Sequence, residues 1–260
     1  MASARAALLS RVRGRRPVSV LGFALRLPAE FRYHYVERDF EPLSRQFALA
    51  HVSTGDRVVD VGAHIGMYTL LLGRAVGVSG HVIAVEPAPE NLRYVQQNIA
   101  ANRLSDRVEV IAAAASDVTG TAQLHITGSS DSHGLFGHPL TETRSLLTVD
   151  TVRLDEVVGR VDFVKIDTEG AELKTLSGMR ETLVAPGARA ALVEWNPKCM
   201  RLAGDEPHAL PAVLDEMGFA LTVLDDNASV ERSVPDVLAG LASGALPSAW
   251  YGNLACVKRA

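Results

Sequence analysis

The stretch that most constrains the fold of this chain is VVDVGAHIGMYT, residues 58–69, in which a β-branched run passes Asp60 and enters a helical pattern through two glycines. A second apolar run, residues 82–85, follows and ends at Glu86. In open α/β sheets, ligands bind beyond the carboxyl ends of neighbouring parallel strands, at a glycine-containing turn into a helix. The sequence therefore predicts a nucleoside-bearing cofactor held above the ends of two parallel strands.

Further along the chain, apolar runs alternate with helical patterns, as a doubly wound parallel sheet requires. Seven strands are expected, at residues 57–61, 81–85, 108–112, 161–166, 190–194, 219–224 and 254–258. Two more segments, residues 121–126 and 148–153, predict an inserted strand pair. The polar segment 127–149 predicts a substrate lid, because a long loop at the ligand-binding edge of a sheet is usually functional.

The composition limits the classes of function. The formal net charge is -4 over 260 residues, which argues against general nucleic-acid binding. Residues 1–29 contain six arginines and no acidic residue; a solvated N-terminal extension is expected, with a membrane-surface, partner-binding or targeting segment as the alternative. No apolar run has the roughly 18 residues of a membrane span. Cys199 and Cys256 are the only cysteines, which is typical of a reducing cytoplasm.

The turn after the first strand favours a particular cofactor. Dehydrogenases hold pyrophosphate on G-x-G-x-x-G, whereas this chain has Gly62 and Gly66 with His64 between them. The preceding carboxylate of Asp60 would repel a pyrophosphate but suits an ammonium group, which indicates S-adenosylmethionine and disfavours a NAD-dependent oxidoreductase. Glu86 lies where an acid accepts hydrogen bonds from ribose hydroxyls.

A second acidic motif, FVKIDTEGAE, covers residues 163–172, so that Asp167 ends the fourth strand and Glu169 precedes the next helix. A helix N-terminus favours one carboxylate, but three in six residues point to a reaction site. Glu194 and Asn196 follow on the fifth strand. An oxygen-ligand site for Mg²⁺ made by Asp167, Glu194 and Asn196 is an alternative that the pattern leaves open.

Three blocks, VVDVGAHIGMYTLLLG, VDFVKIDTEGAELKTLSGM and ALVEWNP, resemble the FkbM-type family of S-adenosylmethionine-dependent methyltransferases. The resemblance implies an α/β fold: a seven-stranded, Rossmann-like, doubly wound class I methyltransferase sheet with its last strand antiparallel. It makes residues 57–260 the methyltransferase domain and residues 1–56 an N-terminal extension and cap. It also implies O-methylation of small molecules, often sugar-containing natural products.

The resemblance implies that the first glycine turn lines the methionine portion and that Glu86 binds ribose. We expect the cofactor site to be lined by Asp60, Gly62, Ala63, His64, Gly66, Tyr68, Thr69, Glu86, Pro87, Asn91, Ala114, Ser116 and Asp167. Asp167 and Glu169 are the expected catalytic residues, and His133 is expected to contribute from the lid. No metal ligand is assigned in this interpretation.

Other functions remain open at this stage. Base N-methylation usually relies on an Asn/Asp-Pro-Pro-aromatic turn after the fourth strand, where this chain has residues 167–170, DTEG. This turn disfavours base N-methylation, but a nucleic-acid or protein methyltransferase is the first alternative. A non-catalytic cofactor-binding module is a further alternative. The expected partner is a small molecule carrying a hydroxyl group, with no nucleic acid. The sequence does not identify that acceptor, and it leaves the oligomeric state open, a homodimer being one option.

Overall fold

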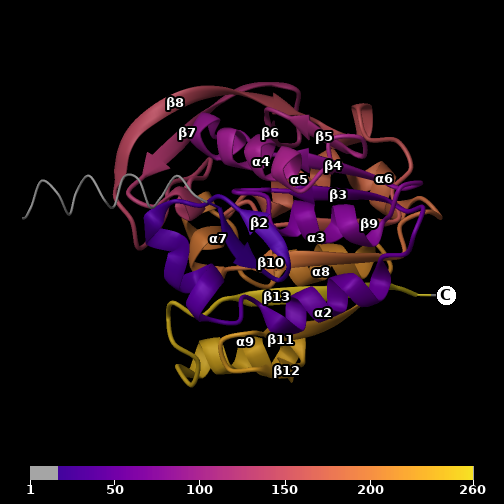
Figure 1. Cartoon of the computed structure of the whole chain (residues 1–260). Helices are drawn as coiled ribbons and strands as arrows, with labels where there is room; N and C mark the ends of the chain where they lie inside the picture. Colours follow the sequence, from indigo (N-terminus) through magenta and orange to yellow (C-terminus); the bar gives the residue numbers. More distant parts are fainter. Residues whose placement is uncertain (1–16, 260) are drawn as a thin grey trace, which may run out of the picture.

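The computed structural model describes residues 17–259, so that the arginines of residues 1–16 lie outside the described part of the chain. Its centre is an eight-stranded sheet with the order β12-β11-β13-β10-β9-β3-β4-β5 (Figure 1). The strands are β3 (Arg57–Val61), β4 (His81–Val85), β5 (Val108–Ile111), β9 (Phe163–Ile166), β10 (Ala190–Trp195), β11 (Phe219–Asp225), β12 (Val230–Arg232) and β13 (Gly252–Lys258).

The directions of the strands match the expected class. Strands β5, β4, β3, β9 and β10 run parallel, and β13 lies antiparallel between β10 and β11. The expected count of seven strands is one short, because β12 pairs antiparallel with β11 at the edge of the sheet. This strand has three residues, which is too few to show the alternation that identifies a strand in a sequence.

Helices cover both faces of the sheet because neighbouring residues of a buried strand point to opposite sides. Val58 packs in a cluster with α2 and α3, whereas Val59 packs with α5, α6 and α8. The first face carries α2 (Pro42–His51), α3 (Met67–Ala75) and α4 (Pro89–Ala101), and the second carries α5 (Glu172–Gly178), α6 (Arg180–Val184), α8 (Ala209–Glu216) and α9 (Val234–Ser243). No helix within residues 17–259 is long and apolar enough to cross a membrane.

The N-terminal segment packs against the sheet domain. A hairpin, β1 (Val18–Val20) and β2 (Phe23–Leu25), is followed by the short helices η1 (Ala29–Phe31) and η2 (Tyr33–Glu37). The side chain of Asn98 on α4 bonds both the N–H and the carbonyl of Arg26, and that of Asn102, the C-cap of α4, does the same with Ala24. These paired hydrogen bonds fix the cap on the first face.

The inserted strand pair is confirmed. β7 (Gly120–Thr127) and β8 (Thr143–Val152) pair antiparallel and, with β6 (Ala114–Ala115), form a second, three-stranded sheet. Both strands are longer than expected, so that the loop between them covers residues 128–142 rather than 127–149. This loop contains the short helix η3 (Ser130–Ser132). The remaining elements are η4 (Leu154–Glu156) and α7 (Pro197–Ala203).

Candidate active site

A cavity of about 420 Å³ lies at the carboxyl ends of β3, β4, β9 and β10. Residues that follow these strands line it, together with residues of the loop 128–142 and of the N-terminal segment. An open α/β sheet places its ligand site at this edge. The predicted lid is thus found over the predicted site.

The turn after β3 is fixed by close packing against the turn after β9. Gly62 has φ +76°, and a Cβ atom placed there would lie 1.7 Å from the carbonyl oxygen of Asp167. Its N–H donates to the carbonyl of Val85 on β4. Only glycine allows both the left-handed conformation and this approach, so this residue brings three strand ends together.

Glu86 is held rigidly at the end of β4. Its carboxylate accepts hydrogen bonds from the N–H groups of His64 (2.8 Å) and Ala88 (2.9 Å) and from the side-chain amide of Asn91 (3.2 Å). Burial raises its pKa to about 7, although these three donors lower it. The side-chain oxygen of Asn91 is buried and has no hydrogen-bond partner among residues 17–259, and Asn91 lines the same cavity. Glu86 and Asn91 thus offer hydrogen-bond acceptors that suit the hydroxyl and amino groups of a nucleoside.

Nine of the predicted cofactor residues line the cavity: Gly62, Ala63, His64, Tyr68, Glu86, Pro87, Asn91, Ala114 and Asp167. The other four, Asp60, Gly66, Thr69 and Ser116, are not among its lining residues. Asp60 is fully buried and accepts a hydrogen bond from the Thr69 hydroxyl at 2.5 Å, and the Ser116 hydroxyl donates to Asp117. These side chains support the site from behind its wall.

The predicted catalytic acids converge at the end of β9. Asp167 lies 2.9 Å from the ammonium of Lys165, and one carboxylate oxygen each of Asp167, Glu169 and Glu194 lie within 4.8 Å of one another. Burial raises the pKa of Glu169 and of Glu194 well above the usual range, and the neighbouring acid charges raise it further. Glu172 accepts hydrogen bonds from the N–H groups of Thr168 and Gly170 and so fixes the turn.

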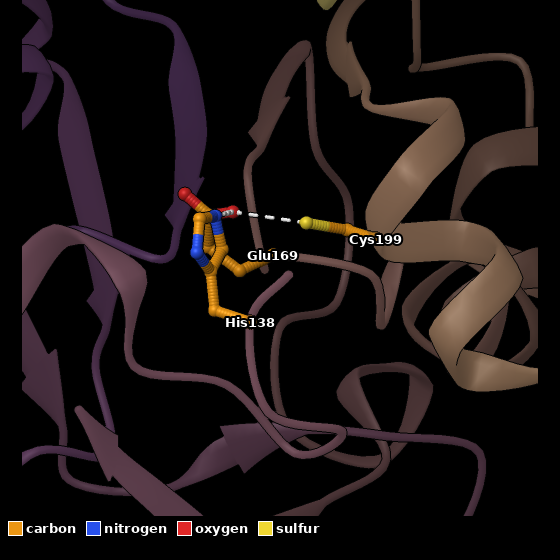
Figure 2. A group of neighbouring side chains, drawn as sticks. All are labelled: His138, Glu169 and Cys199. Carbon is orange, nitrogen blue, oxygen red and sulfur yellow. Dashed lines mark hydrogen bonds and ion pairs between the residues drawn. The ribbon is translucent and has the colours of Figure 1, made fainter. Parts of the chain in front are cut away.

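The loop contributes a histidine that the sequence analysis did not select. His138 Nε2 lies 3.7 Å from Glu169 Oε2, and the thiol of Cys199 donates to the same oxygen at 3.6 Å (Figure 2). His133 lines the cavity too, but its Nδ1 accepts a hydrogen bond from the N–H of Thr127. Two histidines five residues apart in a polar loop give no pattern from which the one nearer the acids could be chosen.

The loop 128–142 also contacts two of the predicted cofactor residues, His64 and Asn91. The hydroxyl of Ser130 lies 3.0 Å from His64 Nε2, and the carbonyl of Ser130 accepts from the amide of Asn91 at 3.1 Å. Burial lowers the pKa of His64 to about 4, so that its ring is neutral near pH 7. The loop therefore closes over both halves of the cavity.

The N-terminal segment supplies a wall that the sequence analysis did not predict. Phe31, Tyr35, Phe40 and Glu41 line the cavity, and the Phe31 ring lies 4.9 Å from the His64 ring, centroid to centroid. The hydroxyl of Tyr68 donates to Glu41 at 2.7 Å. The only signal in the sequence is a group of four aromatic residues within positions 31–40, and such residues are as common in a core as at a site.

The alternative oxygen site of the sequence analysis is rearranged in the structure. The side-chain oxygen of Asn196, expected to bind Mg²⁺ in that alternative, instead accepts a hydrogen bond from the N–H of Cys199. It thereby caps the N-terminus of α7. Glu169 instead joins Asp167 and Glu194 in the group of converging oxygens.

A mainly parallel sheet defines the class I methyltransferase fold when its last strand in the chain, here β13, runs antiparallel between two others. The glycine turn after β3 and the acid after β4 belong to the same class. Solved structures show the same fold. A protein of Clostridium thermocellum described as an rRNA methylase superimposes with a TM-score of 0.53 at 12% identity, covering 84% of this chain and 96% of its own. A precorrin-6y C5,15-methyltransferase of Geobacter metallireducens gives 0.51 at 11% identity, covering 94% and 98%.

Comparison of the sequence with those of known proteins identifies the family of this methyltransferase. The model of the methyltransferase FkbM domain matches residues 60–221, more than half of the chain, and methyltransferase sdnD of Sordaria araneosa is 24% identical over 230 residues, 76% of this chain and 84% of that protein. The chain belongs to the FkbM family of S-adenosylmethionine-dependent methyltransferases. Membership confirms both the resemblance and the expected cofactor, S-adenosyl-L-methionine.

Proposed function

We propose that this methyltransferase acts on a hydroxyl oxygen of a small molecule, a sugar or a glycosylated natural product. The observation that carries the proposal is that Glu86 and Glu169 line the same cavity of about 420 Å³. That volume lies within the range of small-molecule sites. Nearby carboxylates are acceptors for the several hydroxyl groups of a sugar, and the aromatic wall offers an apolar surface beside them.

The residues of the first half of the cavity fit the cofactor. Glu86 would hold the ribose, the free side-chain oxygen of Asn91 would accept from an amino group, and Gly62 leaves room for close approach. When bound, S-adenosylmethionine supplies a methyl group already activated on a positive sulfur, so that the protein needs to supply positioning and proton removal.

Glu169 is the proposed general base. Its raised pKa makes its carboxylate a better acceptor for a hydroxyl proton than an exposed glutamate. Asp167, held by Lys165, is proposed to orient the acceptor hydroxyl, and His133 to contact the acceptor from the lid. Glu169 would take the proton of the acceptor hydroxyl as the methyl group passes to the acceptor oxygen and its bond to the cofactor sulfur breaks.

We also propose the division of the chain into a cap, residues 1–56, and a methyltransferase domain, residues 57–260, since residues 31–41 contribute side chains to the wall of a cavity otherwise built by the sheet domain. Two buried, unpaired cysteines, Cys199 and Cys256, support a cytoplasmic location. Fractionation of the source cell tests the location.

The experiment that tests the proposal is mass spectrometry of candidate glycosides incubated with the protein and isotopically labelled S-adenosylmethionine. A product that gains one methyl group on oxygen supports it. E86A is expected to weaken cofactor binding at least about tenfold by calorimetry, whereas E169Q is expected to keep that affinity and lower kcat about 10²- to 10⁴-fold.

Other outcomes identify the alternatives. Methylation of RNA or protein but of no small molecule would replace the proposed acceptor. Cofactor binding without transfer to any acceptor would favour a non-catalytic module, and an E169Q variant with unchanged kcat would remove the proposed base.

A further inference from the structure

Three carboxylates of this cavity are arranged like the ligands of one ion. Asp167 and Glu169 follow β9 and Glu194 lies on β10, yet one oxygen from each lies within 4.8 Å of the other two. Oxygen ligands stand about 2.0–2.6 Å from Mg²⁺ or Ca²⁺, so that two ligands of one ion are up to about 5 Å apart. All three side chains line the cavity, which gives an ion a path from solvent.

A second observation separates this group from an ordinary acidic cluster. The residue Glu194 is only 7% exposed, and its Oε2 atom is buried with no hydrogen-bond partner within the described residues. A buried carboxylate oxygen without a donor is costly unless a ligand completes it. That oxygen belongs to a side chain that borders the cavity.

The charges around the group are incompletely balanced by the protein. Lys165 contacts Asp167, and the fourth nearby acid, Glu172, is satisfied by backbone N–H groups. Lys198 also lines the cavity, but within residues 17–259 no ion pair joins it to these acids. A bound cation would supply the missing positive charge beside Glu194.

A neighbouring group, His138, Glu169 and Cys199, also has converging ligand atoms (Figure 2). Its members already satisfy one another, because the histidine and the thiol both contact Glu169. Cys199 is also not among the residues that line the cavity. The all-carboxylate group is therefore the more accessible of the two and the one with an unsatisfied oxygen.

The geometry points to a site for one hard divalent cation, Mg²⁺ or Mn²⁺, held by Asp167, Glu169 and Glu194. Carboxylate oxygens are the ligands such ions prefer. The role of the ion rests on the proposed function: beside an acceptor hydroxyl, a divalent cation lowers the pKa of that hydroxyl and fixes its position. One carboxylate oxygen of Glu169 would bind the ion, and the other would accept the hydroxyl proton. Binding of the ion does not depend on that role.

Electron paramagnetic resonance of Mn²⁺ tests the site directly, using the full chain after chelator treatment and without cofactor or acceptor. Wild-type protein is expected to bind one Mn²⁺ per chain, displaceable by Mg²⁺. E194Q is expected to weaken binding at least about tenfold, since loss even of an outer ligand partner costs 10- to 100-fold. E169Q serves in its place if E194Q does not fold.

The matched control is D131N, which removes a carboxylate from the loop over the same cavity but not from the three-residue group. Its Mn²⁺ affinity is expected to equal that of the wild type. Wild-type protein that leaves millimolar Mn²⁺ free, or an E194Q variant that binds it equally well, overturns the inference.

Methylation assays with and without chelator keep the two proposals apart. Methyl transfer that persists in chelator, together with no Mn²⁺ binding, would contradict the metal site and leave the proposed function standing. Mn²⁺ binding without methylation of any hydroxyl would support the metal site and contradict the proposed function.

Discussion

Lys165 Nζ lies 2.9 Å from Asp167 Oδ2, in a position where the lysine is buried and its ammonium is 5.2 Å from the centre of the Tyr68 ring. Burial lowers the pKa of Lys165, but the charges of Asp167 and Asp60 outweigh it and raise the pKa overall. The lysine is therefore charged throughout the physiological range. It gives the acidic end of the cavity a fixed positive charge.

K165M is expected to lower the free energy of unfolding by about 3–5 kcal/mol, because it leaves the partner charge of a buried pair uncompensated. Urea denaturation measures the change, and adding D167N to K165M is expected to recover part of it. The control K174M breaks a half-exposed pair with Asp117 and is expected to cost less than about 1 kcal/mol. Equal urea midpoints for K165M and the wild type would contradict the argument.

G62A is expected to cost about 2–5 kcal/mol, combining the left-handed conformation with a steric overlap against the carbonyl of Asp167. Gly204 offers a control, because it too has positive φ, +89°, but has no atom within 4 Å of its would-be Cβ. G204A should therefore cost only the conformational part, about 1–2 kcal/mol. Thermal and urea unfolding of both variants measure the difference; identical losses would show that the contact between the two turns is not tight.

The central sheet could be predicted from the sequence because strands buried on both faces are near-continuous apolar runs. Glu86 and Asp167 could be found for a related reason, since each directly follows such a run and the ends of parallel strands share one edge. Glu169 lies two residues beyond Asp167. The sequence predicted less well which residue near a strand end faces the cavity. Asp60, one residue before the end of β3, was expected to line the cofactor site, but its side chain is fully buried.

The walls that come from other parts of the chain could not be predicted. Phe31 and Glu41 reach the cavity because the N-terminal segment docks on α4 through Asn98 and Asn102, a contact between residues more than 70 positions apart. The choice of His138 over His133 depends on how the loop folds onto Glu169. Neither docking nor loop folding has a periodic signature.

H138A is expected to loosen the loop 128–142. His138 Nδ1 accepts from the N–H of Leu140 at 3.2 Å, so that Nε2 carries the hydrogen that faces Glu169. Loss of this 3.7 Å contact, which is worth up to about 1 kcal/mol, is expected to speed chymotryptic cleavage at Phe136 about two- to fivefold. Mass spectrometry of the fragments measures the rate.

The control for H138A is H125A, which removes a histidine of β7 that bonds Thr143 and does not line the cavity. Cleavage of H125A at Phe136 is expected to follow the wild-type rate more closely than that of H138A. A loop in H138A that resists chymotrypsin as well as the wild type would show that the lid is held by other contacts, such as those of Ser130.

The last prediction concerns pH and Glu41. Burial and the charge of Asp167 raise the pKa of this carboxyl from 4.5 to about 7 in the folded protein, although the nearby Lys165 and the Tyr68 hydroxyl lower it. Between pH 4.5 and about pH 7 the folded state binds more protons at Glu41 than the unfolded state does. The free energy of unfolding therefore falls as the pH rises. The contribution is about 1–3 kcal/mol, allowing for the partial exposure of the side chain.

Urea unfolding at pH 5 and pH 8 is expected to show a smaller loss of stability for E41Q than for the wild type, since glutamine keeps the acceptor for Tyr68 and does not ionise. E37Q, which alters an exposed acid of the same segment, should keep the wild-type loss; equal pH dependence of E41Q and E37Q would mean that Glu41 is ionised without cost in the fold.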